Sequence, residues 1–267
     1  MSALYVIGIG PGDADGMTAE ARASLARCEA VYGYTAYIDL VRPCVPTGTD
    51  LVSTPMTREV ERCRLALESA ASGRTTAMVC SGDAGVYGMA SPVLELASSY
   101  PSVKVEVISG VTAAQSGAAL LGAPLAHDYV VISLSDLLTP WETIERRLEA
   151  AAAGDFCICL YNPRSSRRSW TLAKAAEILL RTLPADRPCG WARNIGREGE
   201  SCGTCTLSEL AELEADMFTT VFVGNSATRM IDGRLVTPRG YREAGRSEDA
   251  ESPADGASGL HAVQDER

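Results

Sequence analysis

The sequence predicts an α/β fold whose first half contains a parallel sheet. Three apolar runs of strand length, at residues 4–9, 75–80 and 103–108, are each followed by a glycine turn and then by a helical pattern. Strands that alternate with helices need crossover connections, which give parallel sheets. The chain of 267 residues is long enough for one large domain or two modest ones.

The first turn, between residues 8 and 12, differs from a dinucleotide-binding loop. Its glycines are spaced G-x-G-x-G rather than G-x-G-x-x-G, and Pro11 removes an N–H group that a pyrophosphate would use. Thr18 then provides the N-cap of a helix that runs to about Cys28. We therefore expect this loop to serve something other than a dinucleotide.

The turn at residues 81–88 is the strongest candidate for a ligand site. It joins the strand at 75–80 to a helical pattern over residues 89–96, and α/β proteins bind ligands where strands end. Its glycines let a ligand approach the backbone closely, and Asp83 is its one charged residue. A glycine turn without a ligand is the alternative, because such turns are common between strands and helices.

Three further segments complete the first half. The tyrosines at residues 32–37 can line the pocket of a flat ligand, although core packing is the commoner role of such a cluster. Residues 57–71 form an amphipathic helical pattern. In the third glycine turn, at residues 109–115, Thr112 can cap a helix of small residues that ends at Leu121 and should pack closely against a neighbour.

The second half of the chain continues with apolar runs and helical patterns. Strands are predicted at residues 128–134, 155–161, 188–193 and 219–223. One helix is predicted with Thr139 as N-cap and Glu142 completing a capping box, and two others at residues 170–181 and 207–213. Residues 242–267 lack an apolar pattern, so we expect a disordered acidic tail there.

The formal net charge of −10 disfavours both a nucleic-acid partner and an anionic membrane surface. No apolar run reaches the roughly 18 residues of a membrane span. Local arginine clusters nevertheless suit a small substrate that carries carboxylates, with a solvated surface role as the alternative. One cluster contains Arg164, Arg167 and Arg168, and the other contains Arg193 and Arg197.

The nine cysteines are scattered along the chain. Five of them fall within apolar patterns and are expected to be buried thiols, namely Cys28, Cys63, Cys80, Cys157 and Cys159. Cys202 and Cys205 form a CxxC pair, but the chain has no second pair at metal-site spacing and only two histidines. We therefore expect no metal site, and we expect a cytoplasmic protein with reduced thiols.

Five motifs follow one another in the order and spacing of a known family. They are Gly8–Asp13 (GIGPGD), Ser81–Gly88 (SGDAGVYG), Ser109–Ala114 (SGVTAA), Leu160–Pro163 (LYNP) and Val223–Ser226 (VGNS). Together they resemble the tetrapyrrole (corrin/porphyrin) methyltransferases, from residue 3 to about residue 241. The resemblance implies two α/β domains of the tetrapyrrole methylase type, at residues 1–115 and 116–241, with the active site in the cleft between them.

The resemblance also implies the cofactor, S-adenosylmethionine (SAM), and its contacts. The residues that match the family's SAM-binding positions are Pro11, Ser81, Gly82, Asp83, Val86, Thr112, Ala113, Asn162 and Ile195. Ser109 departs from the family pattern, which often has proline before the glycine, and this affects the stiffness of the turn more than its chemistry. SAM is a sulfonium cation that needs no phosphate cradle, and the glycine turns contain no lysine or arginine.

Several stretches, among them residues 127–141 and 231–241, are most similar to the branch that methylates C(17) of precorrin-3B, or of its cobalt form, in cobalamin biosynthesis. That branch is expected to couple methylation to ring contraction, which needs a base for the proton of the C(20) hydroxyl. The segment 127–141 offers His127, Ser133 and Asp136 as catalytic groups, and a loop histidine that caps a strand is the alternative for His127.

The same resemblance implies a tetrapyrrole (precorrin) substrate whose carboxylates could bind Arg164, Arg167, Arg193 and Arg197. It also implies a homodimer. Three alternatives remain: methylation of another ring carbon, a family member that acts on ribosomal RNA, and a non-catalytic escort that holds a labile tetrapyrrole. The acidic net charge disfavours the ribosomal RNA enzyme.

Overall fold

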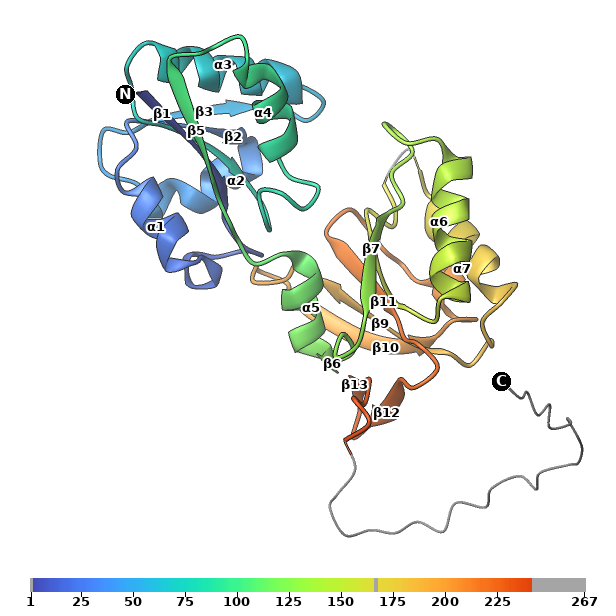
Figure 1. Cartoon of the computed structure of the whole chain (residues 1–267). Coiled ribbons are helices and arrows are strands. Elements are labelled where there is room, and N and C mark those ends of the chain that lie inside the picture. The colour runs from blue at the N-terminus through green and yellow to red at the C-terminus, as the bar shows by residue number, and fades with distance from the viewer. Residues whose placement is uncertain (1, 166–167, 242–267) are drawn as a thin grey trace, which may run out of the picture.

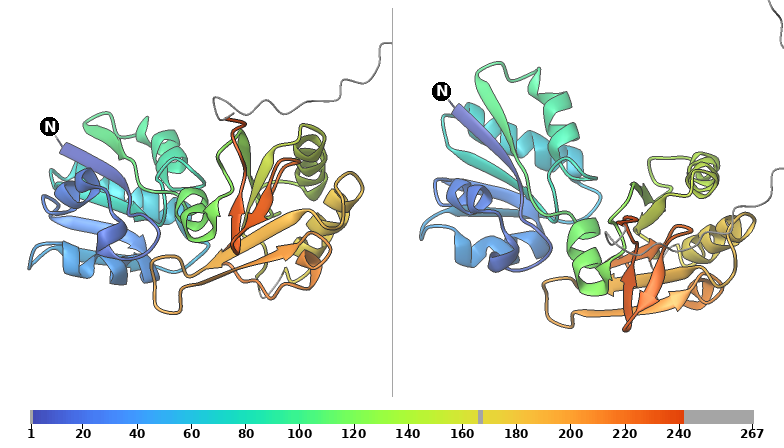
Figure 2. Two further views of the ribbon diagram at one scale, coloured as in Figure 1. Left: turned by 90° about the horizontal axis from the view of Figure 1, so that it is seen from below. Right: turned by 60° about the horizontal axis from the view of Figure 1, so that its bottom comes forward.

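The computed structural model describes residues 2–165 and 168–241, which form two α/β domains side by side (Figures 1 and 2). The predicted acidic tail at 242–267 and Arg167 lie outside the described residues. Helix α5, Ala113–Leu121, lies at the junction of the two domains. Within the described residues, no helix combines the length and the apolar character needed to span a membrane.

The N-terminal domain contains a five-stranded parallel sheet in the order β3-β2-β4-β1-β5. Its strands are β1 (Ser2–Gly8), β2 (Ala30–Tyr34), β3 (Asp50–Thr54), β4 (Thr76–Cys80) and β5 (Val103–Ile108). Every residue of β4 is buried, as expected for the middle strand of a sheet covered on both faces. The parallel sheet predicted for the first half is confirmed.

Helices cover both faces of this sheet. They are α1 (Ala19–Leu25), α2 (Thr35–Val41), α3 (Glu59–Ala71) and α4 (Ala90–Ala97), with short 3₁₀ turns at Ala14–Gly16 and Arg42–Cys44. One apolar core contains Leu67 of α3 and Val93 of α4, and a separate core on the other face contains Leu25 of α1 and Ile38 of α2. Thr18 caps α1 as predicted, because its hydroxyl accepts the N–H of Ala21.

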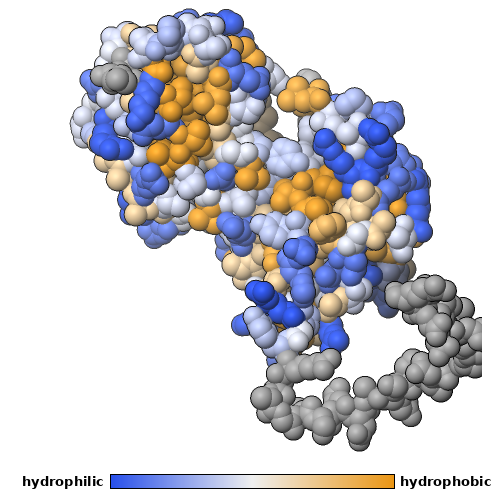
Figure 3. Space-filling model, in the orientation of Figure 1, coloured by the Kyte–Doolittle hydropathy of each residue, from blue (hydrophilic) through white to orange (hydrophobic). Residues whose placement is uncertain are grey.

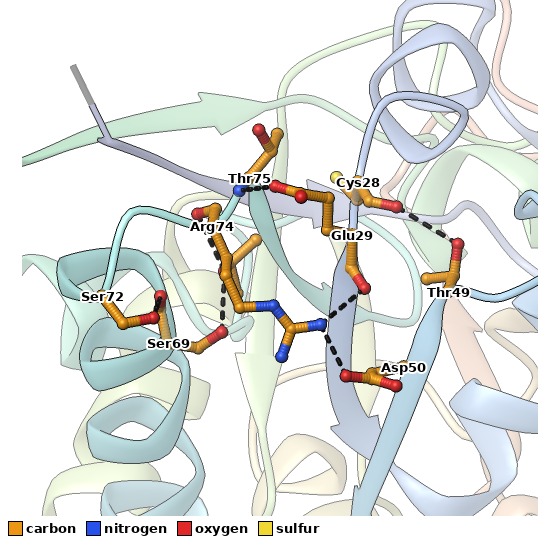
Figure 4. A network of polar contacts seen from close by, with 9 residues as sticks. Cys28, Glu29, Thr49, Asp50, Ser69, Ser72, Arg74 and Thr75 are labelled. Atoms are coloured by element: carbon orange, nitrogen blue, oxygen red, sulfur yellow. Dashed lines mark hydrogen bonds and ion pairs between the residues drawn. The ribbon is translucent and has the colours of Figure 1, made fainter.

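A polar network fixes the amino ends of β2, β3 and β4 (Figure 4). The Arg74 guanidinium donates to the carbonyl of Glu29 at 3.0 Å and to the carboxylate of Asp50 at 2.6 Å. The Glu29 carboxylate in turn accepts the N–H of Thr75 at 2.7 Å. These contacts set the register of three strands at their amino ends. The opposite, carboxyl ends of the strands remain available for a functional site.

The C-terminal domain contains a mixed sheet in the order β10-β9-β11-β8-β7. Its strands are β7 (Tyr129–Ser133), β8 (Cys157–Tyr161), β9 (Pro188–Arg193), β10 (Ser201–Thr206) and β11 (Thr219–Val223). Only β7 and β8 pair in parallel, and the other neighbours are antiparallel. A second sheet of this half contains β6 (Gly122–Ala123), β12 (Arg229–Ile231) and β13 (Arg234–Val236).

Helices α6 (Trp141–Ala153) and α7 (Thr171–Leu180) share one core with the mixed sheet, and α5 packs in another. A Cβ atom on Gly117 of α5 would lie 2.9 Å from the ring of Phe222, so the close packing predicted for this small-residue helix is confirmed. The domain boundary predicted after residue 115 therefore falls inside a helix that packs on the mixed sheet of the C-terminal domain.

Two predicted helical features in this half are wrong. Helix α6 begins at Trp141 with Pro140 as N-cap and no side-chain cap, so Thr139 and Glu142 form no capping box. Residues 207–213 contain only the 3₁₀ turn Leu210–Glu212, because a segment this short packs as a turn rather than as a stable helix. The five cysteines predicted to be buried are buried.

Candidate active site between the two domains

Three glycine turns meet at the carboxyl ends of β1, β4 and β5. A Cβ atom on Gly8 would lie 2.7 Å from the Gly82 carbonyl oxygen and 2.8 Å from the Gly110 nitrogen. Gly10 and Gly82 exchange two backbone hydrogen bonds, of 3.0 and 2.7 Å. The loops therefore pack backbone against backbone, at distances that a side chain would not allow.

The Asp83 carboxylate ties two of these loops together. Its Oδ1 accepts the N–H groups of Gly85 and Val86 at 2.8 and 3.1 Å, and its Oδ2 accepts the N–H of Gly110 at 2.9 Å. Both carboxylate oxygens thus accept hydrogen bonds within the protein. Asp83 does not line the pocket that lies between the two domains. We conclude that this carboxylate shapes the turn at residues 81–88.

Replacing Asp83 with alanine is expected to weaken binding of SAM, the cofactor that the family resemblance implies, about 10- to 100-fold, because a charge-assisted hydrogen bond contributes roughly 1.5–3 kcal/mol. Asp83→Asn retains an acceptor for Gly85 and Val86 but presents an amide to the Gly110 N–H, so it isolates the link between the loops. Calorimetry with S-adenosylhomocysteine (SAH) measures both effects. An unchanged SAH affinity in a folded Asp83→Ala protein would refute this role.

A pocket lies between the two domains, and residues of both line it. Of the nine residues predicted for the cofactor, all except Asp83 line this one pocket. They come from the loops after β1, β4 and β5, from the start of α5, and from the ends of β8 and β9. Asn162 and Asn194, at the ends of β8 and β9, adopt left-handed φ values of 53° and 51°, a region that asparagine tolerates well.

Tyr161, at the end of β8, connects the pocket wall to α5. Its hydroxyl lies 2.5 Å from the Thr112 hydroxyl and accepts the N–H of Ala114 at 2.7 Å. The cap predicted for the Thr112 side chain is therefore wrong, since the Tyr161 hydroxyl takes the free N–H in the first turn of α5. Burial raises the pKa of Tyr161, so this hydroxyl stays protonated near neutral pH.

Tyr87 reaches from the N-terminal domain to β7, an edge strand of the mixed sheet in the C-terminal domain. Its hydroxyl donates to the Val131 carbonyl and accepts the Ser133 N–H, both at 3.2 Å. The ring centroid of Tyr87 lies 5.8 Å from that of Tyr161. A tyrosine with a φ of 53° is strained, and such strain is often retained where it serves function.

Backbone and guanidinium contacts join the domains on another side of the pocket. A Cβ atom on Gly12 would lie 2.8 Å from the Cα atom of Gly196, and closer still to its carbonyl group. Beside this contact, Arg197 donates from Nε to the Pro11 carbonyl at 3.2 Å and from Nη2 to the Ser81 hydroxyl at 2.9 Å. Loop 194–199 therefore holds two glycine turns of the other domain.

The three predicted catalytic residues do not lie together. Ser133 is beside the pocket, where its hydroxyl accepts from the Asn162 side chain at 3.0 Å. Asp136 follows in the next loop and forms an ion pair with Arg168 at 3.3 Å. His127 is exposed and precedes β7, so the whole length of that strand separates it from Ser133. This placement gives His127 no support as a catalytic group.

The predicted substrate arginines also differ in their surroundings. Arg197 lines the pocket. Arg164 donates to the carbonyl of Leu213 at 3.3 Å, and Arg193 bonds to the carbonyl of Glu214, so both hold the loop before β11. Arg193 and Arg164 thus bond to backbone carbonyl groups of the protein and do not line the pocket.

Several pocket residues were missed by the predictions from sequence. They are Tyr87, Tyr161, Asn194 and residues 217–220. Tyr37 also lines the pocket, as expected if the tyrosine cluster serves a ligand. Asparagine after a strand end is a signal for a left-handed residue, and it could have identified Asn194. Residues 217–220, which run into β11, carry no local signal, because they reach the pocket only through the antiparallel strand order of the mixed sheet.

Comparisons with known proteins agree on one family. The sequence profile of the tetrapyrrole (Corrin/Porphyrin) methylases matches residues 3–211. A Salmonella typhimurium protein, a probable cobalt-factor III C(17)-methyltransferase, is 48% identical over 240 residues, which cover 89% of this chain and 99% of that protein. The precorrin-3B C(17)-methyltransferase of a Sinorhizobium species is 41% identical over 250 residues, or 90% and 98% of the two chains. The crystal structure of the methyltransferase CobJ matches with a TM-score of 0.84 and 37% identity, covering 89% of this chain and 100% of that one.

Proposed function

The chain belongs to the tetrapyrrole (corrin/porphyrin) methylase family, and we propose that it transfers the methyl group of SAM to C(17) of precorrin-3B or of its cobalt form, cobalt-factor III. One structural observation carries this proposal: loops of both domains bring every residue predicted for SAM except Asp83 to a single pocket. The C(17) position follows from the relatives, which match this chain over nearly their whole length.

The residues of the pocket fit SAM chemically. Its wall consists of small, hydroxyl, aliphatic, aromatic and amide side chains with one cation, Arg197, and without lysine or a carboxylate side chain. Glycine loops expose backbone groups that can bind an adenosine and an amino-acid tail. When bound, SAM supplies an electrophilic methyl group on its sulfonium. A pocket without a phosphate cradle suits that cation.

Positioning and exclusion of water are the main tasks of this chain's residues. Methyl transfer is an in-line displacement, and its rate depends on alignment of donor and acceptor. Tyr87 and Arg197 each bond across the domain boundary, so they hold the two walls of the pocket at a fixed separation. The buried Tyr161 hydroxyl is a protonated, neutral group near neutral pH and adds no negative charge to the wall.

The activity is tested by incubating the purified protein with SAM and either precorrin-3B or cobalt-factor III. The proposal predicts SAH release and a tetrapyrrole product that has gained one methyl group, with a changed absorbance spectrum. Isotopically labelled SAM and NMR locate the methyl carbon on the macrocycle. A label at another ring carbon would indicate the related methyltransferase, and tight tetrapyrrole binding without SAH release would indicate an escort protein.

Asp136 is expected to serve ring contraction, the step that follows methyl transfer, and not methyl transfer itself. Asp136→Asn should slow contraction about 10²- to 10⁴-fold, the usual contribution of a general acid or base, while methyl transfer continues. Mass spectrometry and absorbance would then detect a methylated, uncontracted intermediate. His127→Ala serves as the matched control, because His127 lies at the far end of β7. Contraction at the wild-type rate in Asp136→Asn would exclude this carboxylate.

The protein is expected to form a homodimer through the β5 edge of the N-terminal sheet. Figure 3 shows apolar surface gathered near β5 and α4, where Val107 and Leu94 are 45% and 51% exposed. Because β5 is an edge strand, its outer backbone groups are available for pairing. Lys104 and Glu106 flank Val105, so an antiparallel pair of β5 strands centred on Val105 places each lysine opposite a glutamate.

Light scattering tests this assembly. The wild type should have twice the chain mass of 28.2 kDa at micromolar concentration, and Val107→Lys should be a monomer. Leu138→Lys, at a 98% exposed position outside this surface, should remain a dimer. A wild-type mass of one chain would refute the dimer.

All nine cysteines are free thiols, which supports a cytoplasmic, reducing location.

A further inference from the structure

Arg197 is the one charged residue in the pocket wall. It belongs to the C-terminal domain, but its Nε and Nη2 atoms donate to Pro11 and Ser81 of the N-terminal domain. The rings of Phe218 and Tyr37 flank the guanidinium, with centroids 5.4 and 6.0 Å from its Cζ atom. The side chain is thus held in one orientation at the domain boundary.

This guanidinium has an incomplete set of partners. Among the described residues, its hydrogen bonds use Nε and Nη2, and no carboxylate lies within ion-pair distance of it. Arg197 also lines an adjoining groove together with Asp13, Glu198 and Glu200, but none of these three carboxylates pairs with it, and Glu200 accepts the Gly196 N–H instead. Partial burial without an anion lowers the pKa of Arg197. Such a cation is stabilised when a ligand brings a carboxylate to it.

Two ligands of the proposed reaction carry carboxylates, the amino-acid tail of SAM and the side chains of the tetrapyrrole. We propose that Arg197 binds the carboxylate of the SAM tail, an assignment that rests on the proposed function. Its two fixed partners, Pro11 and Ser81, lie in the glycine turns after β1 and β4, where the cofactor loops converge. The remaining Nη1 group makes no hydrogen bond to a described residue and is available to a ligand carboxylate.

This role also connects cofactor binding to the arrangement of the domains. The guanidinium that receives the carboxylate is the group that bonds to both N-terminal loops. A bound tail therefore neutralises the charge of Arg197 while its contacts to Pro11 and Ser81 remain. We expect the cofactor to hold the two domains in the arrangement seen here.

The test uses a pair of ligands that differ only in the carboxylate, SAH and decarboxylated SAH. Calorimetry with wild type, Arg197→Gln and Arg197→Lys is compared with Arg229→Gln, a control at an exposed position in β12. Arg197→Gln should weaken SAH binding about 10- to 100-fold more than it weakens binding of decarboxylated SAH, because only SAH loses the carboxylate contact as well as the contacts between the domains. Arg197→Lys should recover part of the SAH affinity, and melting temperatures confirm folding.

Two results would overturn the assignment. If Arg197→Gln weakens both ligands equally, the arginine acts only by holding the domains. If SAH binding is unchanged and the KM for the tetrapyrrole rises, Arg197 binds a substrate carboxylate. A wild-type protein that fails to bind SAH at all would instead refute the proposed SAM-dependent function, an outcome distinct from both.

Discussion

Replacing Gly110 with alanine is expected to destroy the cofactor loops and to destabilise the N-terminal domain. A Cβ atom there would lie 2.5 Å from the Gly8 carbonyl oxygen and closer still to that of Gly82. Both obstacles are backbone atoms at the ends of buried strands, so no side-chain rotation can relieve the clash. We expect a loss of about 3 kcal/mol or more in the free energy of unfolding, and a melting temperature lower by roughly 6–12 °C.

The effect on SAM binding should be larger than 100-fold, or about 2.7 kcal/mol, because all three turns must separate. Thermal unfolding and calorimetry with SAH measure the two consequences. Gly85→Ala is the matched control in the same loop, since its Cβ atom would meet only the Asp83 carboxylate, at 3.3 Å. A Gly110→Ala protein with wild-type stability and SAH affinity would show that these backbones have room to move.

The strands and helices that carry strong periodicity could be predicted from sequence. The buried run that became β4 and the amphipathic α3 have local patterns that match their final environment. By contrast, β2 and α2 were missed, because their tyrosines suggested a pocket or core cluster and hid the change from strand to helix at Tyr34. Strand β10 was missed as well, since its CxxC pair lies in an edge strand with little apolar character.

The candidate site was predicted best where its residues lie in glycine turns. Ser81 and Val86 are close in sequence to a strand end, and a strand end is a recognisable position for ligands. The contacts that Tyr87, Tyr161 and Arg197 make could not be predicted, because each joins segments that are distant in sequence. Their partners depend on the relative position of two domains, which local patterns do not encode.

Asp83 illustrates the same limit in a single residue. Its position in the turn correctly marked it as important for that loop, and its lone charge suggested a direct contact with the ligand. In the structure, its oxygens accept hydrogen bonds from three backbone N–H groups, one of them on the loop after β5. A carboxylate among free N–H groups satisfies those donors first, so a charge in a glycine turn predicts loop shape as readily as ligand binding.

Replacing Gly12 with alanine is expected to lower kcat/KM about 100-fold while both domains remain folded. The new methyl group would collide with the backbone of Gly196, which belongs to the other domain. This clash differs from that at Gly110, because two domains can separate where a buried sheet cannot. The melting temperature should therefore change little, although the contacts of Arg197 with Pro11 and Ser81 lengthen.

Steady-state kinetics and small-angle X-ray scattering test this expectation together. Gly12→Ala should show a larger radius of gyration and a raised KM for SAM, whereas the Gly85→Ala control should match wild type in both. Saturating SAH should return the radius of gyration toward the wild-type value, because a cofactor bound to loops of both domains favours the closed arrangement. If Gly12→Ala has wild-type kinetics and scattering, the contact between Gly12 and Gly196 does not set the geometry of the pocket. If it unfolds instead, the two domains depend on each other for stability, and the pocket walls cannot move independently.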